Sequence, residues 1–280
     1  MVTTIEEKTS LHIVRNYKVV FSLEFSQAIM KQNHLIAKIA TEYDEIESSK
    51  RLRHRVFSKN SRYISDCRKA GEMIDTDCFD LQAEHLVLID NVRRKNGSKD
   101  YVVGTCRLIT GDYLDGPQHF YSNSEFVLDK LLQSPKRFLE LGRACVDHDY
   151  RLGPALFFLW RTLLRYLVNK DVETIFGVAS FHGRSPDDFS HALSFLHYNY
   201  TLETSVVRAR AEAFIKLNQV AEDCIDLSKV NKQLPPLLKA YLGYGAWVGQ
   251  GAFLDRNFET LDIFVSVNKS QILTRYKSII

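Results

Sequence analysis

The sequence predicts an α/β fold built on one mixed β-sheet. Two β-rich segments, residues 85–90 and 101–109, are joined through Asn96-Gly97, a dipeptide typical of hairpins, so we expect antiparallel neighbours. A strand, an apolar helix and a second strand then follow one another over residues 138–181, an order that favours a parallel crossover. Because the hairpin and the crossover must share one sheet, that sheet is predicted to be mixed.

The first regular elements follow an N-terminal extension. Residues 1–33 show no sustained period, and we expect them to form a loosely attached extension ahead of one domain over residues 34–280. Leu35–Ala40 has the composition of a strand. Thr41 is predicted to be the N-cap of a helix that reaches Phe57, because acidic residues occupy the first turn after it.

The crossover is predicted from three consecutive segments. Phe138–Val146 is a strand, residues 153–170 form the most apolar helix of the chain, and residues 174–181 form a buried strand. A further helix is expected over residues 186–200.

The last part of the chain predicts one helix over residues 227–242 and a strand over residues 261–267. Between them, residues 243–251 contain glycines spaced G-x-G-x3-G-x-G. Because this segment follows a helix-like pattern and not a strand, it is a poor dinucleotide fingerprint. Close backbone packing or a flexible acceptor-side loop fits it better.

Composition and charge exclude several classes of protein. Hydrophobic residues make up 45% and charged residues 25% of the 280 residues, which is typical of a globular protein. The formal net charge of +3 is too small to indicate nucleic-acid binding. No run of about 18 apolar residues predicts a spanning helix, and we expect no secretory signal. The cysteines never form C-x-x-C, which favours reduced thiols in the cytoplasm and no metal site.

One candidate site is the turn that precedes the apolar helix. Val146 ends the strand before it. Arg151, Gly153 and Ala155 follow, and the backbone N–H groups and helix dipole of such a turn suit an anion. An ordinary turn into a core helix is the alternative.

A second candidate is the pair Glu140 and Arg143 within an apolar strand, where charges are costly to bury unless they are paired or functional. Strict alternation places the two side chains on opposite faces. A bulge at Gly142 would bring them to one face, and bulges recur beside active sites. A structural ion pair is the alternative.

Further charged residues occur in two other places. Asp75, Asp77 and Asp80 lie within six residues and could bind an ammonium group or a row of arginines. A solvated acidic loop without a binding role is the alternative. Arg53 lies in a predicted helix. Arg107 lies inside a β pattern, where a buried charge requires a partner.

Ten short motifs occur in a recognisable order over about residues 34–266. They are Arg53–Phe57, Asp77–Asp80, His85–Asp90, Val103–Arg107, Leu139–Val146, Asp149–Arg151, Leu159-Trp160, Val178–Phe181, Ala192–His197 and Pro235–Ala246. Together they resemble the bacterial L-ornithine N(alpha)-acyltransferases, a GNAT-like family related to the acyl-homoserine-lactone synthases.

The resemblance implies a fold and a reaction. The fold is a GNAT-like mixed, mostly antiparallel sheet with helices on both faces, in which strands 138–146 and 174–181 form a splayed parallel pair. The reaction moves a 3-hydroxyacyl chain from acyl carrier protein to the α-amino group of L-ornithine, giving lyso-ornithine lipid. The carrier's phosphopantetheine is the donor arm, and no metal or other cofactor is implied.

The resemblance also implies roles for individual residues. Glu140 is the candidate base, and Arg143 lies with it in the catalytic motif. The turn with Val146, Arg151, Gly153 and Ala155 is the phosphopantetheine-binding segment. The acceptor-side charged cluster comprises Arg53, Asp77, Asp80 and Arg107.

Three departures from the family pattern bear on the acceptor more than on acyl transfer. Residues 58–65 lack the expected acidic stretch, His182 replaces the usual proline, and residues 1–33 have no counterpart in the family pattern. Transfer to another amino acid, a lactone synthase that uses S-adenosylmethionine, and a non-catalytic protein on the same fold therefore stay open. The amphipathic product and the slight positive charge favour a cytoplasmic enzyme with peripheral contact at the inner membrane.

Overall fold

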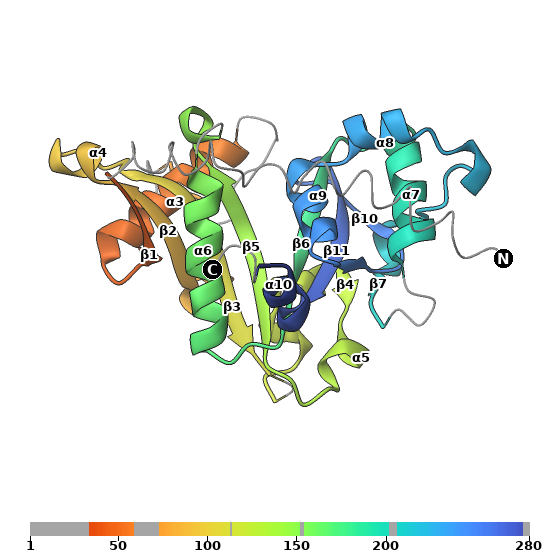
Figure 1. Cartoon of the computed structure of the whole chain (residues 1–280), viewed down its shortest axis with the longest axis horizontal. Coiled ribbons are helices and arrows are strands. Elements are labelled where there is room, and N and C mark those ends of the chain that lie inside the picture. Colours follow the sequence, from red (N-terminus) through yellow and green to blue (C-terminus); the bar gives the residue numbers. More distant parts are fainter. Residues whose placement is uncertain (1–33, 59–72, 113, 152–153, 202–205, 277–280) are drawn as a thin grey trace. The chain divides into compact units, whose positions relative to one another are not determined.

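The computed structural model describes residues 34–58, 73–112, 114–151, 154–201 and 206–276 (Figure 1). The described chain forms two compact units. The N-terminal unit comprises the residues up to Gly111 together with Leu139–Val172. The C-terminal unit comprises Asp112–Phe138 and the residues from Glu173 onward. The predicted extension, residues 1–33, lies outside the described residues, and the single domain over 34–280 stays a prediction.

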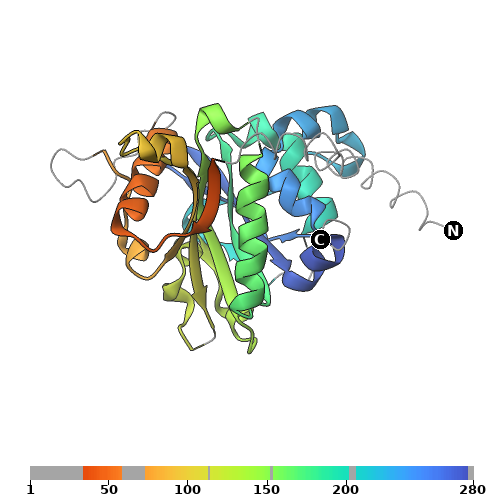
Figure 2. The same cartoon turned by 60° about the vertical axis from the view of Figure 1, so that its left-hand side comes forward.

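The N-terminal unit is a sheet with a helix on each face. Its strands follow the order β1-β2-β3-β5, and β2 runs antiparallel to both β1 and β3. Figure 2 shows α3 and α6 on opposite sides of this sheet. The elements are β1 (Leu35–Ile39), α3 (Tyr43–Phe57), η2 (Cys78–Leu81), β2 (Glu84–Asp90), α4 (Asn91–Lys95), β3 (Val102–Gly111), β5 (Phe138–Val146), η5 (His148–Tyr150) and α6 (Ala155–Asn169).

Alternation along β2 explains why both of its faces are buried. Val87 and Ile89 pack with Leu52 of α3 in one core cluster. Leu88 points the other way, because it borders Gly104 together with Leu159 of α6. The predicted helices on both faces are therefore confirmed for this unit.

The C-terminal unit holds a second set of antiparallel strands in the order β6-β11-β10-β8, with β9 also paired to β11. Strands β4 and β7 form a separate two-stranded sheet. The strands are β4 (Phe126–Val127), β6 (Thr174–His182), β7 (Arg208–Ala209), β8 (Phe214–Ile215), β9 (Trp247–Val248), β10 (Ala252–Asp255) and β11 (Thr260–Asn268). The α-helices are α5 (Asp129–Leu132), α7 (Ser190–Tyr200), α8 (Leu227–Gln233), α9 (Pro236–Gly243) and α10 (Lys269–Tyr276).

Buried phenylalanines form the core of the C-terminal unit. The Phe176 ring stacks on Phe264 with 5.5 Å between centroids and meets Phe120 edge-on at 5.1 Å. The Phe126 ring is tilted against Phe264, with 5.7 Å between centroids. Edge-to-face and offset contacts of this kind add to the stabilisation from apolar burial.

The predicted strands are confirmed, but two helix predictions are wrong. Helix α3 is capped at Glu42 and not at Thr41, because Glu45 reaches back and accepts hydrogen bonds from the N–H groups of both residues. The helix predicted over residues 227–242 is two helices, α8 and α9. Pro235 and Pro236 lack the N–H that a continuous helix needs, and Pro235 also holds the residue before it out of the helical conformation.

The connection between β2 and β3 is longer than the hairpin signal suggested. Asp90 caps α4 by accepting hydrogen bonds from Val92 N and Arg93 N at 2.8 and 3.2 Å. Gly97 ends this helical segment with φ +77°. The predicted antiparallel pairing is confirmed, while Asn96-Gly97 ends a short helix instead of forming the tip of a turn.

The glycine-rich segment serves close packing, one of the two roles expected for it. A Cβ at Gly249 would lie 3.1 Å from Phe264, and one at Gly251 would overlap the Phe214 ring.

Within the part of the chain that the structure describes, no helix has both the length and the hydropathy needed to cross a membrane.

Replacing Gly251 with alanine is expected to lower the free energy of unfolding by about 2–5 kcal/mol. Its φ of +78° costs an L-residue about 1–2 kcal/mol, and overpacking against Phe214 adds about 1–3 kcal/mol. Gly97→Ala is the matched control, because its φ is +77° and no described atom lies within 4 Å of the new Cβ. Urea unfolding of both variants separates backbone strain from packing. Equal losses would show that Phe214 moves aside.

Candidate functional site

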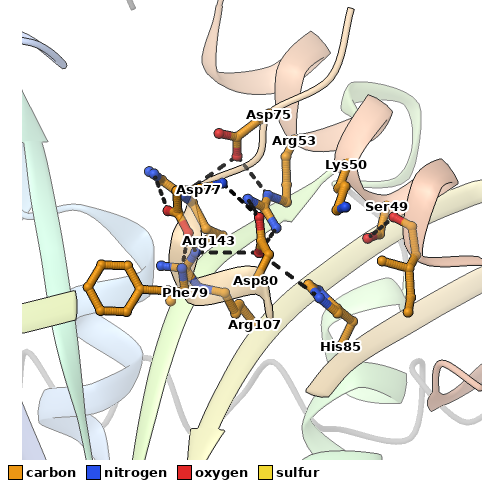
Figure 3. Close-up of polar contacts among 12 residues, drawn as sticks. Ser49, Lys50, Arg53, Asp75, Asp77, Phe79, Asp80, His85, Arg107 and Arg143 are labelled. Atoms are coloured by element: carbon orange, nitrogen blue, oxygen red, sulfur yellow. Dashed lines mark hydrogen bonds and ion pairs between the residues drawn. The ribbon is translucent and has the colours of Figure 1, made fainter. Parts of the chain in front are cut away.

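Three arginines and three aspartates form a closed ring of ion pairs in the N-terminal unit (Figure 3). Arginine and aspartate alternate, so that each residue contacts two of the opposite charge. In order, the ring runs Arg53, Asp80, Arg107, Asp77, Arg143, Asp75 and back to Arg53. Its formal charges balance.

The Arg53 side of the ring has the closest geometry. Arg53 Nε lies 2.6 Å from Asp75 Oδ2, and its two terminal nitrogens donate to Asp80 Oδ1 and Oδ2 at 2.7 and 3.0 Å. Two parallel hydrogen bonds of this kind fix orientation as well as charge. Arg53 is 0% exposed.

The other half of the ring joins two strands. Arg107 Nη1 lies 2.5 Å from Asp77 Oδ1 and 3.4 Å from Asp80 Oδ1. Arg143 Nη2 lies 3.1 Å from Asp77 Oδ2, and its Nε lies 3.6 Å from Asp75 Oδ2. Asp77 therefore links β3 to β5.

Local sequence explains why these side chains converge. Arg53 follows Ser49 by four residues on the buried stripe of α3. Asp77 caps the short helix η2 by accepting a hydrogen bond from Phe79 N at 3.0 Å, while Asp80 accepts one from Asp77 N at 3.1 Å. The acidic run is thus folded into a rigid loop that presents its carboxylates to arginines.

Mutual attraction outweighs burial in the ring. Burial acts against the charged form of Arg53, yet Asp75 and Asp80 raise its pKa. Burial likewise acts to raise the pKa of Asp80, but Arg53 and Arg107 hold it below its usual range. Arg53 and Asp80 therefore stay charged at neutral pH, so removing either one leaves the other buried with only one opposite charge beside it among the described residues.

Strand β5 carries the predicted pair of Glu140 and Arg143. Glu140 is 2% exposed. Gly142 lies two residues further along the strand, and a Cβ there would be 3.6 Å from Arg107 Nε, so by alternation Arg107 lies on the face of Glu140. Arg143 has φ +51°, so the alternation of side chains between the two faces of β5 is interrupted at Arg143 and not, as expected, at Gly142. In this conformation Arg143 contacts Asp77.

Sequence reasoning missed two parts of this site. Asp75 closes the ring but was not among the residues predicted for the acceptor-side cluster. Its position two residues before Asp77 in the same acidic run could have indicated that it belongs there. His85 faces the ring from β2, because it is the register partner of Arg107, and its Nε2 lies 4.0 Å from Asp80 Oδ1. Asp90, at the other end of β2, lies apart from the ring and accepts a hydrogen bond from Tyr150 Oη at 2.5 Å.

His85 is a buried neutral imidazole. Burial lowers the pKa of His85 to about 4; Asp80 opposes this shift, while Arg53, Arg107 and Lys50 add to it. Neither ring nitrogen has a hydrogen-bond partner among the described residues. Protonation of His85 therefore favours the unfolded chain.

Acidification from pH 6.5 to about pH 4 is expected to reduce the free energy of unfolding through His85 by up to about 3 kcal/mol. The folded pKa lies below the unfolded one, so this stability is fully present above pH 6.5 and is lost as the pH falls through the window. His85→Gln cannot be protonated. Urea unfolding of both proteins across this range should give a difference that changes with pH. Parallel curves would exclude His85 as the cause.

The predicted phosphopantetheine-binding turn is placed only in part. Val146 ends β5, and Arg151 Nε donates to its carbonyl oxygen at 3.1 Å. Helix α6 begins at Ala155, with Pro154 as its N-cap residue. Gly153 lies outside the described residues. The structure thus brings Val146 and Arg151 together, and anion binding at this turn stays a prediction.

Comparison with known proteins finds one matching protein family and several similar enzymes that share one name. Residues 52–161 match the family described as the acetyltransferase (GNAT) domain, as predicted. The chain is 35% identical over 246 residues to the L-ornithine N(alpha)-acyltransferase of Rhodobacter capsulatus, covering 86% of this chain and 92% of that protein. It is 32% identical over 269 residues to the enzyme of the same name from Brucella abortus, covering 91% and 95%.

Among solved structures, the fold is similar to that of a CoA-dependent acyl-homoserine lactone synthase, BjaI. The TM-score is 0.48 at 12% identity, with 88% of this chain and 89% of the synthase covered.

Proposed function

Because the chain belongs to the L-ornithine N(alpha)-acyltransferase family, we propose that it transfers an acyl chain to the α-amino group of L-ornithine. The product would be lyso-ornithine lipid. The observation that carries this proposal is identity of 32–35% to four such enzymes over at least 83% of their length.

The chemistry requires a base, and Glu140 is the residue proposed for it. An α-amino group has a pKa near ~8, so most of it is protonated and unreactive at pH 7. As the amine attacks the thioester carbonyl, a C–N bond forms and the C–S bond breaks. The ammonium form first loses one proton to solvent. During attack the second amine proton passes to Glu140, directly or through water, and Glu140 then delivers it to the sulfur, so that the thiol leaves protonated and the carboxylate is restored.

The ion-pair ring supports this assignment by holding β5 in place. Arg143 ties β5 to Asp77 of the acidic loop, and Arg107 ties β3 to the same carboxyl group. Because Arg107 lies on the face of Glu140, it contributes a fixed positive charge there. Arg53, Asp77, Asp80 and Arg107 are thus proposed to order the acceptor side without taking part in proton transfer.

The donor is proposed to be a 3-hydroxyacyl chain on acyl carrier protein. The turn after Val146 would receive its phosphopantetheine, with backbone N–H groups and Arg151 near the single phosphate. No metal or other cofactor is required for this transfer.

The amphipathic product also suggests that the enzyme works in the cytoplasm at the surface of the inner membrane. Flotation with anionic vesicles tests this location. Protein left entirely in the bottom fraction would contradict contact with the membrane.

A donor and acceptor panel tests the reaction. Purified protein is incubated with 3-hydroxyacyl carrier protein or with the same acyl group on coenzyme A, and each is paired with ornithine, lysine or S-adenosylmethionine. Mass spectrometry should detect N-acyl-ornithine, formed at least about ten-fold faster from the carrier. A lactone from S-adenosylmethionine, or no transfer to any amine, would overturn the proposal.

A further inference from the structure

Three carboxyl groups meet in the interior of the C-terminal unit. Glu125, Asp255 and Asp262 are 3%, 8% and 4% exposed, and one carboxylate oxygen of each lies within 4.8 Å of the others. None of the three belongs to the ion-pair ring or to the proposed acyl-transfer chemistry. Burying like charges together is costly unless something of opposite charge binds them.

The strand register builds this cluster. Asp262 on β11 lies opposite Ser180 on β6, and Thr260, two residues before it, lies opposite Asp255 on β10. Directly paired residues, and residues two apart on one strand, share a face of the sheet. Ser180, Thr260, Asp255 and Asp262 therefore present their side chains on one side.

Backbone hydrogen bonds hold the other members in place. Asp255 Oδ1 accepts from Asn257 N at 2.7 Å and from Phe258 N at 3.1 Å. Glu125 is anchored through its carbonyl oxygen, which accepts from Arg210 N at 2.8 Å. Hydrogen bonds with the backbone therefore fix the Asp255 carboxyl group and the main chain at Glu125.

Two oxygens at this place lack partners. The Thr260 hydroxyl group lies beside the Asp262 carboxyl group. Within the described residues, Thr260 Oγ1 and Asp262 Oδ1 are buried and accept or donate no hydrogen bond, although their residues are only 3% and 4% exposed. Buried polar atoms without partners are rare and indicate a bound water or ion.

We propose that Glu125, Asp255 and Asp262 bind one hard divalent cation of the Mg²⁺ or Ca²⁺ class, with the Thr260 hydroxyl group facing it. A set of oxygen donors alone suits these ions, and water completes their coordination. The site stabilises the C-terminal unit and does not depend on the proposed transferase activity.

Calorimetric titration and thermal unfolding of the full chain test this site. Protein stripped with EDTA at pH 7.5 is titrated with MgCl₂, CaCl₂ or MnCl₂. We expect one ion per chain and a rise in Tm on binding. Asp262→Asn should raise the Kd at least ten-fold and, because it removes one of the crowded charges, should unfold in EDTA no earlier than the wild type.

Exposed Asp187 provides the matched control, since Asp187→Asn should bind the ion unchanged. Wild-type protein that binds none of the three ions would overturn the proposal, whatever the variants do. Equal affinity in Asp262→Asn and the wild type would equally overturn it, because the ion would then lie elsewhere.

Discussion

Arg53→Ala is expected to lower the free energy of unfolding by about 3–5 kcal/mol. The substitution removes the closest partner of both Asp75 and Asp80, which keep the longer contacts to Arg143 at 3.6 Å and to Arg107 at 3.4 Å. Breaking a buried ion pair costs about this much. Asp80 also loses both hydrogen bonds of the bidentate pair. Urea unfolding monitored by circular dichroism measures the loss.

Arg55→Ala is the matched control on the same helix. Arg55 is 34% exposed and pairs with the half-exposed Asp100, so its removal should change stability by less than about 1 kcal/mol. Asp80→Asn should cost less in the Arg53→Ala background than in the wild type, because the two residues interact directly. Additive losses, or a loss from Arg53→Ala no larger than from Arg55→Ala, would contradict a closed ring.

Glu140→Gln is expected to reduce turnover at least about 10²-fold while the protein stays folded. Glutamine keeps the size of the side chain but cannot accept the amine proton, and loss of a general base has an effect of this order. Glu140→Asp keeps a carboxylate displaced by one methylene and should retain more activity. Steady-state assays with 3-hydroxyacyl carrier protein and ornithine give the comparison.

Exposed Glu222, in the short 3-10 helix Glu222–Cys224, supplies the control, since Glu222→Gln should retain wild-type turnover. Tm values of all three variants separate loss of chemistry from loss of fold. A Glu140→Gln protein that unfolds like the wild type and turns over at the wild-type rate would remove Glu140 from the mechanism.

Helices and strands that are long enough to show a local pattern of apolar and β-branched residues could be predicted from the sequence. Phe138–Val146 and residues 174–181 show continuous β-rich composition, and the structure has β5 and β6 there. The short strands β4, β7, β8 and β9 were missed because two residues are too few to show a period. Helix ends depended on single side chains, as with Glu45 at the start of α3.

The charged residues of the site were visible in the sequence, but their pairing was not. Arg53 is 22 residues from Asp75, and Arg143 is 66 residues from Asp77. No local pattern connects such positions. The left-handed conformation of Arg143 also has no sequence signal, because this conformation usually favours glycine.

The position of the acyl chain on the product tests the central claim most directly. L-Ornithine carries two amino groups, and only one is proposed to react. Tandem mass spectrometry of the product formed with 3-hydroxyacyl carrier protein should place the amide on the α-nitrogen and leave the side-chain amine free. An amide on the side-chain nitrogen, or no acylated ornithine at all, would contradict the account.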